Sequence, residues 1–199
     1  MKRLETALAA GLLLLAAWAW PAGAAQFKAD LTAVTHGVSH QGKIWVKGGL
    51  VRADLKHRPG VLILRPDQGA LLMVLSRPAY YLALPLSEMP ENLDAFSWPI
   101  AGETKRKLLK TLKVSGRVWQ KYLVESVSGG KLRKFYIWRD KKLSLSVKMT
   151  TTDGRYRASL SNIEKGPQDE ALFSPPPGHK KVTVSKLPGF DWLGGDKKP

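Results

Sequence analysis

Residues 143–150, Leu-Ser-Leu-Ser-Val-Lys-Met-Thr, alternate apolar and polar side chains over the whole stretch. Successive side chains of a β-strand point to opposite faces, so this pattern predicts a strand with one buried face and one face in water. At roughly 1.5–3 kcal/mol per buried side chain, the four apolar residues should hold the strand firmly in register. The stretch therefore indicates an antiparallel sheet.

The same period of two recurs from Phe27 onward, and Gly, Pro and Ser turn signals separate the repeats. This spacing predicts a meander of about ten strands, of which the last four form one sheet. The expected strands are 27–35, 43–47, 50–56, 61–65, 70–76, 79–84, 118–124, 132–138, 143–149 and 155–163.

Two segments depart from the strand pattern. Residues 87–96 contain early capping residues and Pro90, which predicts a short helix. Residues 103–112 are basic and have leucines at 108, 109 and 112, a spacing that suits either a helix or a strand. We favour the helix for this segment.

The strands expected at 61–64, 71–75 and 80–84 are apolar on both faces and need a second layer. A curled sheet can supply that layer with short helices or with a ligand, and a filled core is the alternative. These strands predict a mainly β fold, an antiparallel meander whose sheet curls around short helices or around a ligand. The candidate residues for lining an apolar cavity are Trp45, Ile63, Leu72, Val74, Tyr80, Leu82 and Trp98.

The N-terminus predicts export. Lys2 and Arg3 precede an apolar run at 7–20, which is too short to span a membrane and ends at Pro21 before the small residues 22–24. An uncleaved anchor is the alternative. The domain organisation expected is a signal peptide at 1–24, a folded domain at 25–186 and a flexible tail at 187–199, with a periplasmic location.

The composition excludes several kinds of chemistry. The chain has no cysteine, so disulfides, thiol nucleophiles, Cys-containing zinc sites and a lipidated N-terminal cysteine are ruled out. Its 32 Lys and Arg against 16 Asp and Glu give a net charge of +16. In an exported protein this charge favours an anionic membrane surface over nucleic acid as a partner, although it can also serve solubility alone.

Sites for catalysis or metals are weakly represented. His36 and His40 would share one face of a helix, but Gly37 and the strand context place them at a turn. No Gly-x-Ser-x-Gly elbow or phosphate-binding glycine loop occurs. The sequence thus predicts a protein that is not an enzyme and needs no cofactor or metal.

Basic residues suggest a membrane contact. In a meander successive turns alternate ends, which predicts that the segment from 105 and the turn at 139–142 meet at one end as a basic rim. The rim candidates are Lys105, Arg106, Lys107, Arg139, Lys141 and Lys142.

Several motifs carry a resemblance to a known family. Residues 42–47, Gly-Lys-Ile-Trp-Val-Lys, lead to 50–52, then to a strand at 61–65 and an aromatic pair ending at Tyr81. Near the other end, 173–179 read Phe-Ser-Pro-Pro-Pro-Gly-His and run into Val182. Together these resemble the outer-membrane lipoprotein carrier superfamily, the LolA/LolB-like fold, over roughly residues 26–184.

The resemblance implies that the meander forms an incomplete, unclosed antiparallel barrel, with one or two short helices covering its concave face and an apolar cavity for the acyl chains of lipoproteins. Two departures stand beside it. The carriers have a functional arginine directly after the Trp-Val-Lys strand, where this chain has Gly48, and Arg52 lies near that place without matching it. The carriers also begin with an amphipathic helix, whereas this chain enters a strand at Phe27. We expect binding of a lipid or of lipoprotein acyl chains in the envelope, or alternatively a structural or regulatory module that acts through its basic surface.

Overall fold

The computed structural model describes residues 26–35, 37–56, 60–86, 103–128 and 131–182. Twelve strands in these ranges form one sheet, antiparallel except for the pair β12–β6. The strands are β1 (Gln26–Thr35), β2 (Val38–Lys47), β3 (Leu50–Leu55), β4 (Val61–Arg65), β5 (Ala70–Leu75), β6 (Tyr80–Pro85), β7 (Glu103–Val114), β8 (Arg117–Ser128), β9 (Lys131–Asp140), β10 (Leu145–Thr151), β11 (Tyr156–Lys165) and β12 (Lys180–Lys181). Their order in the sheet is β12-β6-β5-β4-β3-β2-β1-β11-β10-β9-β8-β7.

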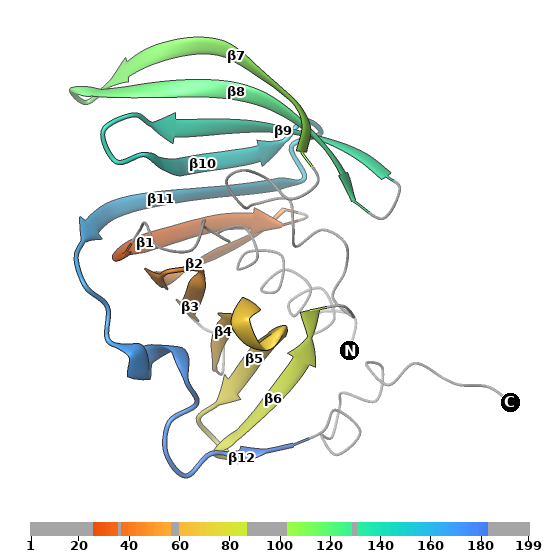
Figure 1. Ribbon diagram of the computed structural model, residues 1–199, viewed down its shortest axis with the longest axis vertical. Helices are drawn as coiled ribbons and strands as arrows, with labels where there is room; N and C mark the ends of the chain where they lie inside the picture. The colour runs from red at the N-terminus through yellow and green to blue at the C-terminus, as the bar shows by residue number, and fades with distance from the viewer. Residues whose placement is uncertain (1–25, 36, 57–59, 87–102, 129–130, 183–199) are drawn as a thin grey trace, which may run out of the picture.

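Strand β1 joins the two halves of the sheet. It pairs with β2 along one edge and with β11 along the other, so that Leu31 stands opposite both Gly42 and Leu160. The N-terminal and C-terminal strands thus form one continuous surface, which curls without closing on itself (Figure 1). The predicted mainly β fold, an antiparallel meander left open as an incomplete barrel, is confirmed.

The helix expected at 103–112 is wrong. These residues belong to β7, which pairs with β8 and forms one edge of the sheet. A bulge between Leu108 and Lys110 interrupts the alternation of the strand. The bulge accommodates the consecutive Leu108 and Leu109, which are both exposed and whose spacing with Leu112 favoured a helix.

Short 3-10 helices stand at η2 (Pro66–Gln68) and η5 (Glu170–Phe173) among the described residues. The helix expected at 87–96, the signal peptide and the tail lie outside the described residues. Within the ranges that the structure describes, no helix is both long and apolar enough to cross a membrane.

Candidate functional site

Strand β5 is buried on both faces over four consecutive residues, Leu71–Val74. Leu71 joins a cluster that extends across most of the sheet, whereas Leu72 and Val74 join a second cluster. We call the face that carries Leu71 the inner face and the face that carries Leu72 the outer face. The expectation that this strand needs a layer on each side is confirmed.

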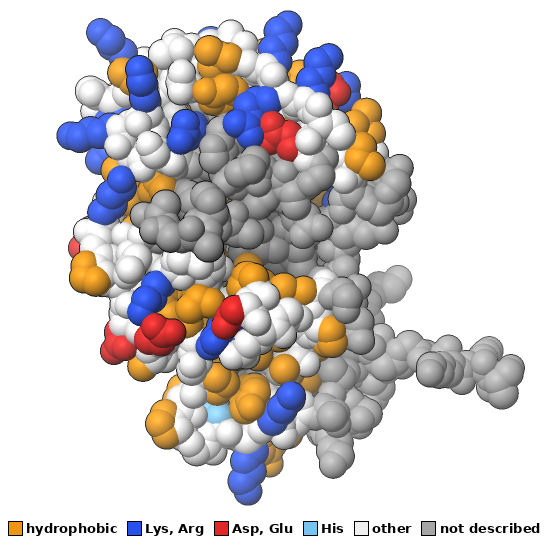
Figure 2. Space-filling view, in the orientation of Figure 1, with side chains coloured by type: hydrophobic (Ala, Val, Ile, Leu, Met, Phe, Trp, Pro, Cys, Tyr) orange, Lys and Arg blue, Asp and Glu red, His pale blue; other side chains and the backbone are white. Residues whose placement is uncertain are grey.

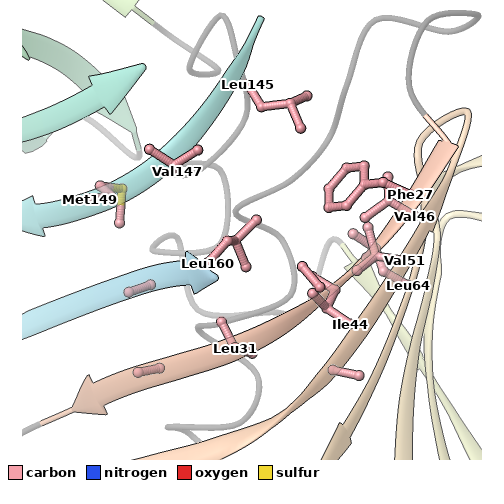
Figure 3. Close-up of a cluster of buried hydrophobic side chains, with 14 of the residues drawn as sticks. Phe27, Leu31, Ile44, Val46, Val51, Leu64, Leu145, Val147, Met149 and Leu160 are labelled. Atoms are coloured by element: carbon pink, nitrogen blue, oxygen red, sulfur yellow. The ribbon is translucent and has the colours of Figure 1, made fainter. Parts of the chain in front are cut away.

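The inner face is a continuous apolar surface. Its cluster draws residues from β1–β6 and from β8–β11, with Phe27, Ile44 and Val46 at 0% exposure. In Figure 3, Leu145 and Val147 of β10 and the side chains of β1–β4 point toward each other across the inside of the curl. The two halves of the sheet thus contribute to one apolar surface.

The outer cluster is closed by the C-terminal segment of the chain. Phe173 of η5 is 0% exposed and packs with Ile63, Leu72 and Val74, and Trp45 lies partly buried against them. In Figure 1 the segment with η5 runs along the outside of the curled sheet. The described helices thus do not match the expectation of short helices on the concave face, because η5 covers part of the outer face and η2 buries no residue.

Arg52 fastens that segment to β3. Its Nη1 donates a hydrogen bond to the carbonyl oxygen of Leu172 at 3.2 Å, while Nε and Nη2 bind both carboxylate oxygens of Asp54 at 2.9 and 3.1 Å. The guanidinium also lies 5.7 Å from the centre of the Trp45 ring. Arg52, the residue nearest to the carrier-arginine position, thus has a structural contact on the outer face.

Arg65 repeats this arrangement one strand further along. Its Nη1 donates to the carbonyl oxygen of Phe173 at 3.0 Å, and Nη2 donates to Asp67 at 2.7 Å. The hydrogen bond from Arg65 lowers the pKa of the Asp67 carboxyl, and the same hydrogen bond raises the pKa of Arg65. The guanidinium groups of Arg52 and Arg65 therefore hold the backbone that positions the Phe173 ring.

Gly48 lies in the tight turn between β2 and β3. Its φ is +54° and that of Gly49 is +95°, so both residues are in conformations that glycine adopts most easily. The local backbone therefore explains why this turn has glycines. It also shows that the place of the carrier arginine is a turn position here.

The cavity candidates are divided between the two faces. Trp45, Ile63, Leu72 and Val74 belong to the outer cluster under Phe173. Tyr80 and Leu82 belong to a small third cluster with Met73, next to the inner face. Trp98 lies outside the described residues. The structure thus brings four candidates together, on the face that the chain itself closes.

The basic candidates do not form a common rim. Lys105 stands opposite Glu125, which stands opposite Lys134 near the start of β9, whereas Arg139 stands opposite Gln120 near its end. Lys141 and Lys142 follow in the turn after β9. The separation arises because residues 103–114 run as a strand beside β8, which distributes their cations along its length.

A group of cations and aromatic rings lies on the outer face of β8–β10. The Lys121 ammonium lies 4.1 Å from the Tyr136 ring centre and 4.8 Å from the Trp138 ring centre, and the Lys148 ammonium lies 5.0 Å from Trp138. The two rings meet edge to face at 6.4 Å. Sequence reasoning missed this group, because only the register between strands brings its members together.

His40 lies buried in β2, and His36 is outside the described residues. Within the described ranges no group of three or more His, Asp or Glu side chains could hold a metal ion.

No family model matches the chain, and no curated protein matches it. Among solved structures it is similar to MucB, with 14% identity over 87% of this chain and 64% of that chain, at a TM-score of 0.49. It is also similar to a putative outer membrane lipoprotein-sorting protein domain from Vibrio parahaemolyticus, with 9% identity over 85% of this chain and 95% of that chain, at a TM-score of 0.40.

A third similar structure is that of PNGF-II, with 10% identity, a TM-score of 0.45 and coverage of 85% of this chain. The chain spans 33% of the length of PNGF-II and 64% of the length of MucB, less than two thirds of either. At these identities and TM-scores, none of the matches assigns a function to this chain.

Proposed function

We propose that this chain is a non-enzymatic protein of the cell envelope that binds a lipid, or the acyl chains of a lipoprotein, on the inner face of its curled sheet. The observation that carries the proposal is the continuity of the inner cluster, to which strands of both halves of the sheet contribute. Each CH2 group that an acyl chain buried there would contribute about 0.8 kcal/mol of binding free energy.

The inner face is favoured over the outer face for a physical reason. On the outer face, Phe173 already fills the space above Ile63 and Leu72, and two arginines hold its backbone in place. A ligand there would have to displace part of the fold. We therefore propose the inner residues as the lipid contacts, with Tyr80 and Leu82 at their margin.

A second candidate function is a structural or regulatory module with a filled core. The observation that favours it is the completeness of burial on the inner face, where Phe27, Ile44, Val46 and Val51 are 0% exposed. Such a module would act through its basic surface. The two candidates differ in whether an acyl chain can enter.

Substitutions at two similarly buried leucines, one on each face, distinguish the two candidate functions. Leu64 of β4 is 3% exposed on the inner face, and Leu72 of the neighbouring strand β5 is 5% exposed on the outer face. Each is changed to phenylalanine, and each variant is studied by urea unfolding and by titration with a fluorescent fatty acid. Purified protein freed of bound lipid is the starting material.

For a lipid-binding inner face we expect Leu64→Phe to weaken binding of the fluorescent fatty acid at least tenfold, with little loss of stability. Leu72→Phe should keep the binding but lose about 1–3 kcal/mol of stability, because it overpacks a filled cluster. No binding by the wild type, together with equal destabilisation of the two variants, would contradict lipid binding and favour the filled module.

We also propose export with cleavage of the N-terminal signal. The support is the 14-residue apolar run at 7–20, which is followed by the small residues 22–24. N-terminal sequencing of the protein from an envelope fraction should begin at Ala25 or Gln26. Retention of Met1 in a membrane fraction would contradict export with cleavage.

A further inference from the structure

The outer face of β7–β10 carries cations in register across four strands. Lys110 of β7 stands opposite Lys121 of β8, which stands opposite Trp138 of β9, which stands opposite Lys148 of β10. In the next row, Lys107 stands in line with Leu123 and Tyr136. We call Lys107, Lys110, Lys121, Tyr136, Trp138 and Lys148 the lysine–aromatic face.

The lysines of this face lie outside the inner cluster, whereas Trp138 is partly buried and packs against that cluster. The residues that alternate with it along β8 and β9, Val124, Phe135 and Ile137, are buried on the inner face. Lys107, Lys110 and Lys148 are exposed, while Lys121 and the two rings are half-buried. Figure 2 shows Lys and Arg side chains gathered over the part of the molecule where Figure 1 places β7–β10.

One pair in this arrangement is unfavourable for folding. Like charges directly opposite one another on neighbouring strands are destabilising, and Lys110 and Lys121 are such a pair. The acidic residues on either side of these rows already have other cations beside them. Asp140, opposite Trp119, is 0% exposed and lies 3.6 Å from Arg117, and Glu125 forms a 2.9 Å ion pair with Lys134. An anionic partner above the face would relieve this repulsion.

The rings indicate what kind of anion that partner is. Trp and Tyr have an apolar body and a polar tip, and both are enriched where membrane meets water. Trp138 lies between the ammonium groups of Lys121 and Lys148, so a ring that enters the headgroup region would bring two cations to the phosphates. A four-stranded face at roughly 4.8 Å per strand presents these groups over an extended area.

We propose that the lysine–aromatic face docks on an anionic phospholipid bilayer, with Trp138 and Tyr136 at the headgroup level and the lysines on the phosphates. The lysines of the docking surface do not belong to the inner cluster, so the lysine variants test docking separately from the lipid site proposed above. The protein would rest on the membrane by this face and leave the inner face to a ligand.

The test uses sedimentation of the mature protein with vesicles of phosphatidylglycerol and phosphatidylcholine. Each lysine near an anionic surface is worth roughly a fivefold change in binding, so the triple variant Lys110→Gln, Lys121→Gln and Lys148→Gln should bind roughly 100-fold more weakly. The matched control removes three exposed lysines elsewhere, Lys56, Lys180 and Lys181, and should bind nearly as well as the wild type.

A second measurement reports on the ring. Vesicles with brominated acyl chains should quench part of the tryptophan fluorescence of the wild type, and Trp138→Phe should remove that quenched part while far-UV circular dichroism stays unchanged. Binding should weaken as salt is raised, because exposed charges are screened.

Four results would overturn the proposal. They are no sedimentation of the wild type with anionic vesicles, equal loss in the two triple variants, identical quenching in wild type and Trp138→Phe, and competition by soluble polyphosphate at matched phosphate concentration without quenching by brominated lipid. The last would identify a soluble polyanion as the occupant.

Discussion

Ile63 and Leu64 are consecutive residues of β4, and both are buried, at 0% and 3% exposure, on opposite faces of the sheet. A strand with water on one side cannot bury two successive side chains, because they point in opposite directions. The chain therefore has two separate apolar layers at this point. Phe173 closes the outer one from 110 residues further along the sequence.

Removal of the Phe173 ring should destabilise the whole fold. The residue is 0% exposed, and its ring fills the outer cluster above Ile63 and Leu72. We expect Phe173→Ala to lower the free energy of unfolding by about 3–5 kcal/mol, as measured by urea denaturation. The control Leu132→Ala, at a residue 57% exposed, should change it by less than about 0.5 kcal/mol. Similar midpoints for the two variants would show that the outer cluster contributes little.

The hydrogen bonds of the Arg65 guanidinium should hold residues 166–180 against local unfolding. A lysine keeps the charge but cannot bind both Asp67 oxygens and the Phe173 carbonyl together. Arg65→Lys should therefore speed proteolytic cleavage between 166 and 180 severalfold in native conditions. Arg155→Lys is the matched control, because Arg155 also pairs with an aspartate two residues away but is 70% exposed. Equal cleavage rates in both variants would contradict the role of Arg65.

Acid should weaken the same attachment. The hydrogen bond from Arg65 holds the pKa of Asp67 below its ordinary value of 3.8, so the folded state binds that proton less readily than the unfolded state. The stabilisation is complete above the ordinary pKa and is lost as pH falls through the lower folded-state value. Asp67→Asn should thus be less stable than the wild type at pH 6, and the difference between their urea midpoints should shrink below about pH 4. A difference that does not vary with pH would count against the ion pair.

The alternation at 143–150 and the two-faced apolar runs at 61–64 and 71–75 were enough to predict an antiparallel sheet with a layer on each side, and its open form was expected from the family resemblance. The element that covers the outer face could not be predicted, because residues 170–173 form a single 3-10 turn with no periodic signal of their own. The lysine–aromatic face also could not be predicted from the sequence, because Lys121 and Trp138 become neighbours only through the β8–β9 register. Strand β7 was predicted wrongly as a helix because the bulge at Leu108 interrupts the alternation of apolar and polar residues.

Two glycines near the β2–β3 hairpin should respond differently to substitution. A Cβ on Gly42 would collide with the backbone carbonyl of Asp54 on the neighbouring strand, whereas a Cβ on Gly48 would meet no atom within 4 Å. Gly42→Ala should therefore cost about 1–3 kcal/mol, because the strands must move apart.

At Gly48 the cost comes from the backbone alone. Its φ of +54° lies in the left-handed region, which disfavours side chains by about 1–2 kcal/mol and disfavours asparagine least. We expect Gly48→Asn to be the mildest change and Gly48→Arg, which places an arginine where the carriers have theirs, to be intermediate. Gly42→Ala should be the most severe. Urea midpoints of the three variants provide the measurement, and a Gly48→Arg variant as stable as the wild type would show that backbone strain does not keep arginine out of this turn.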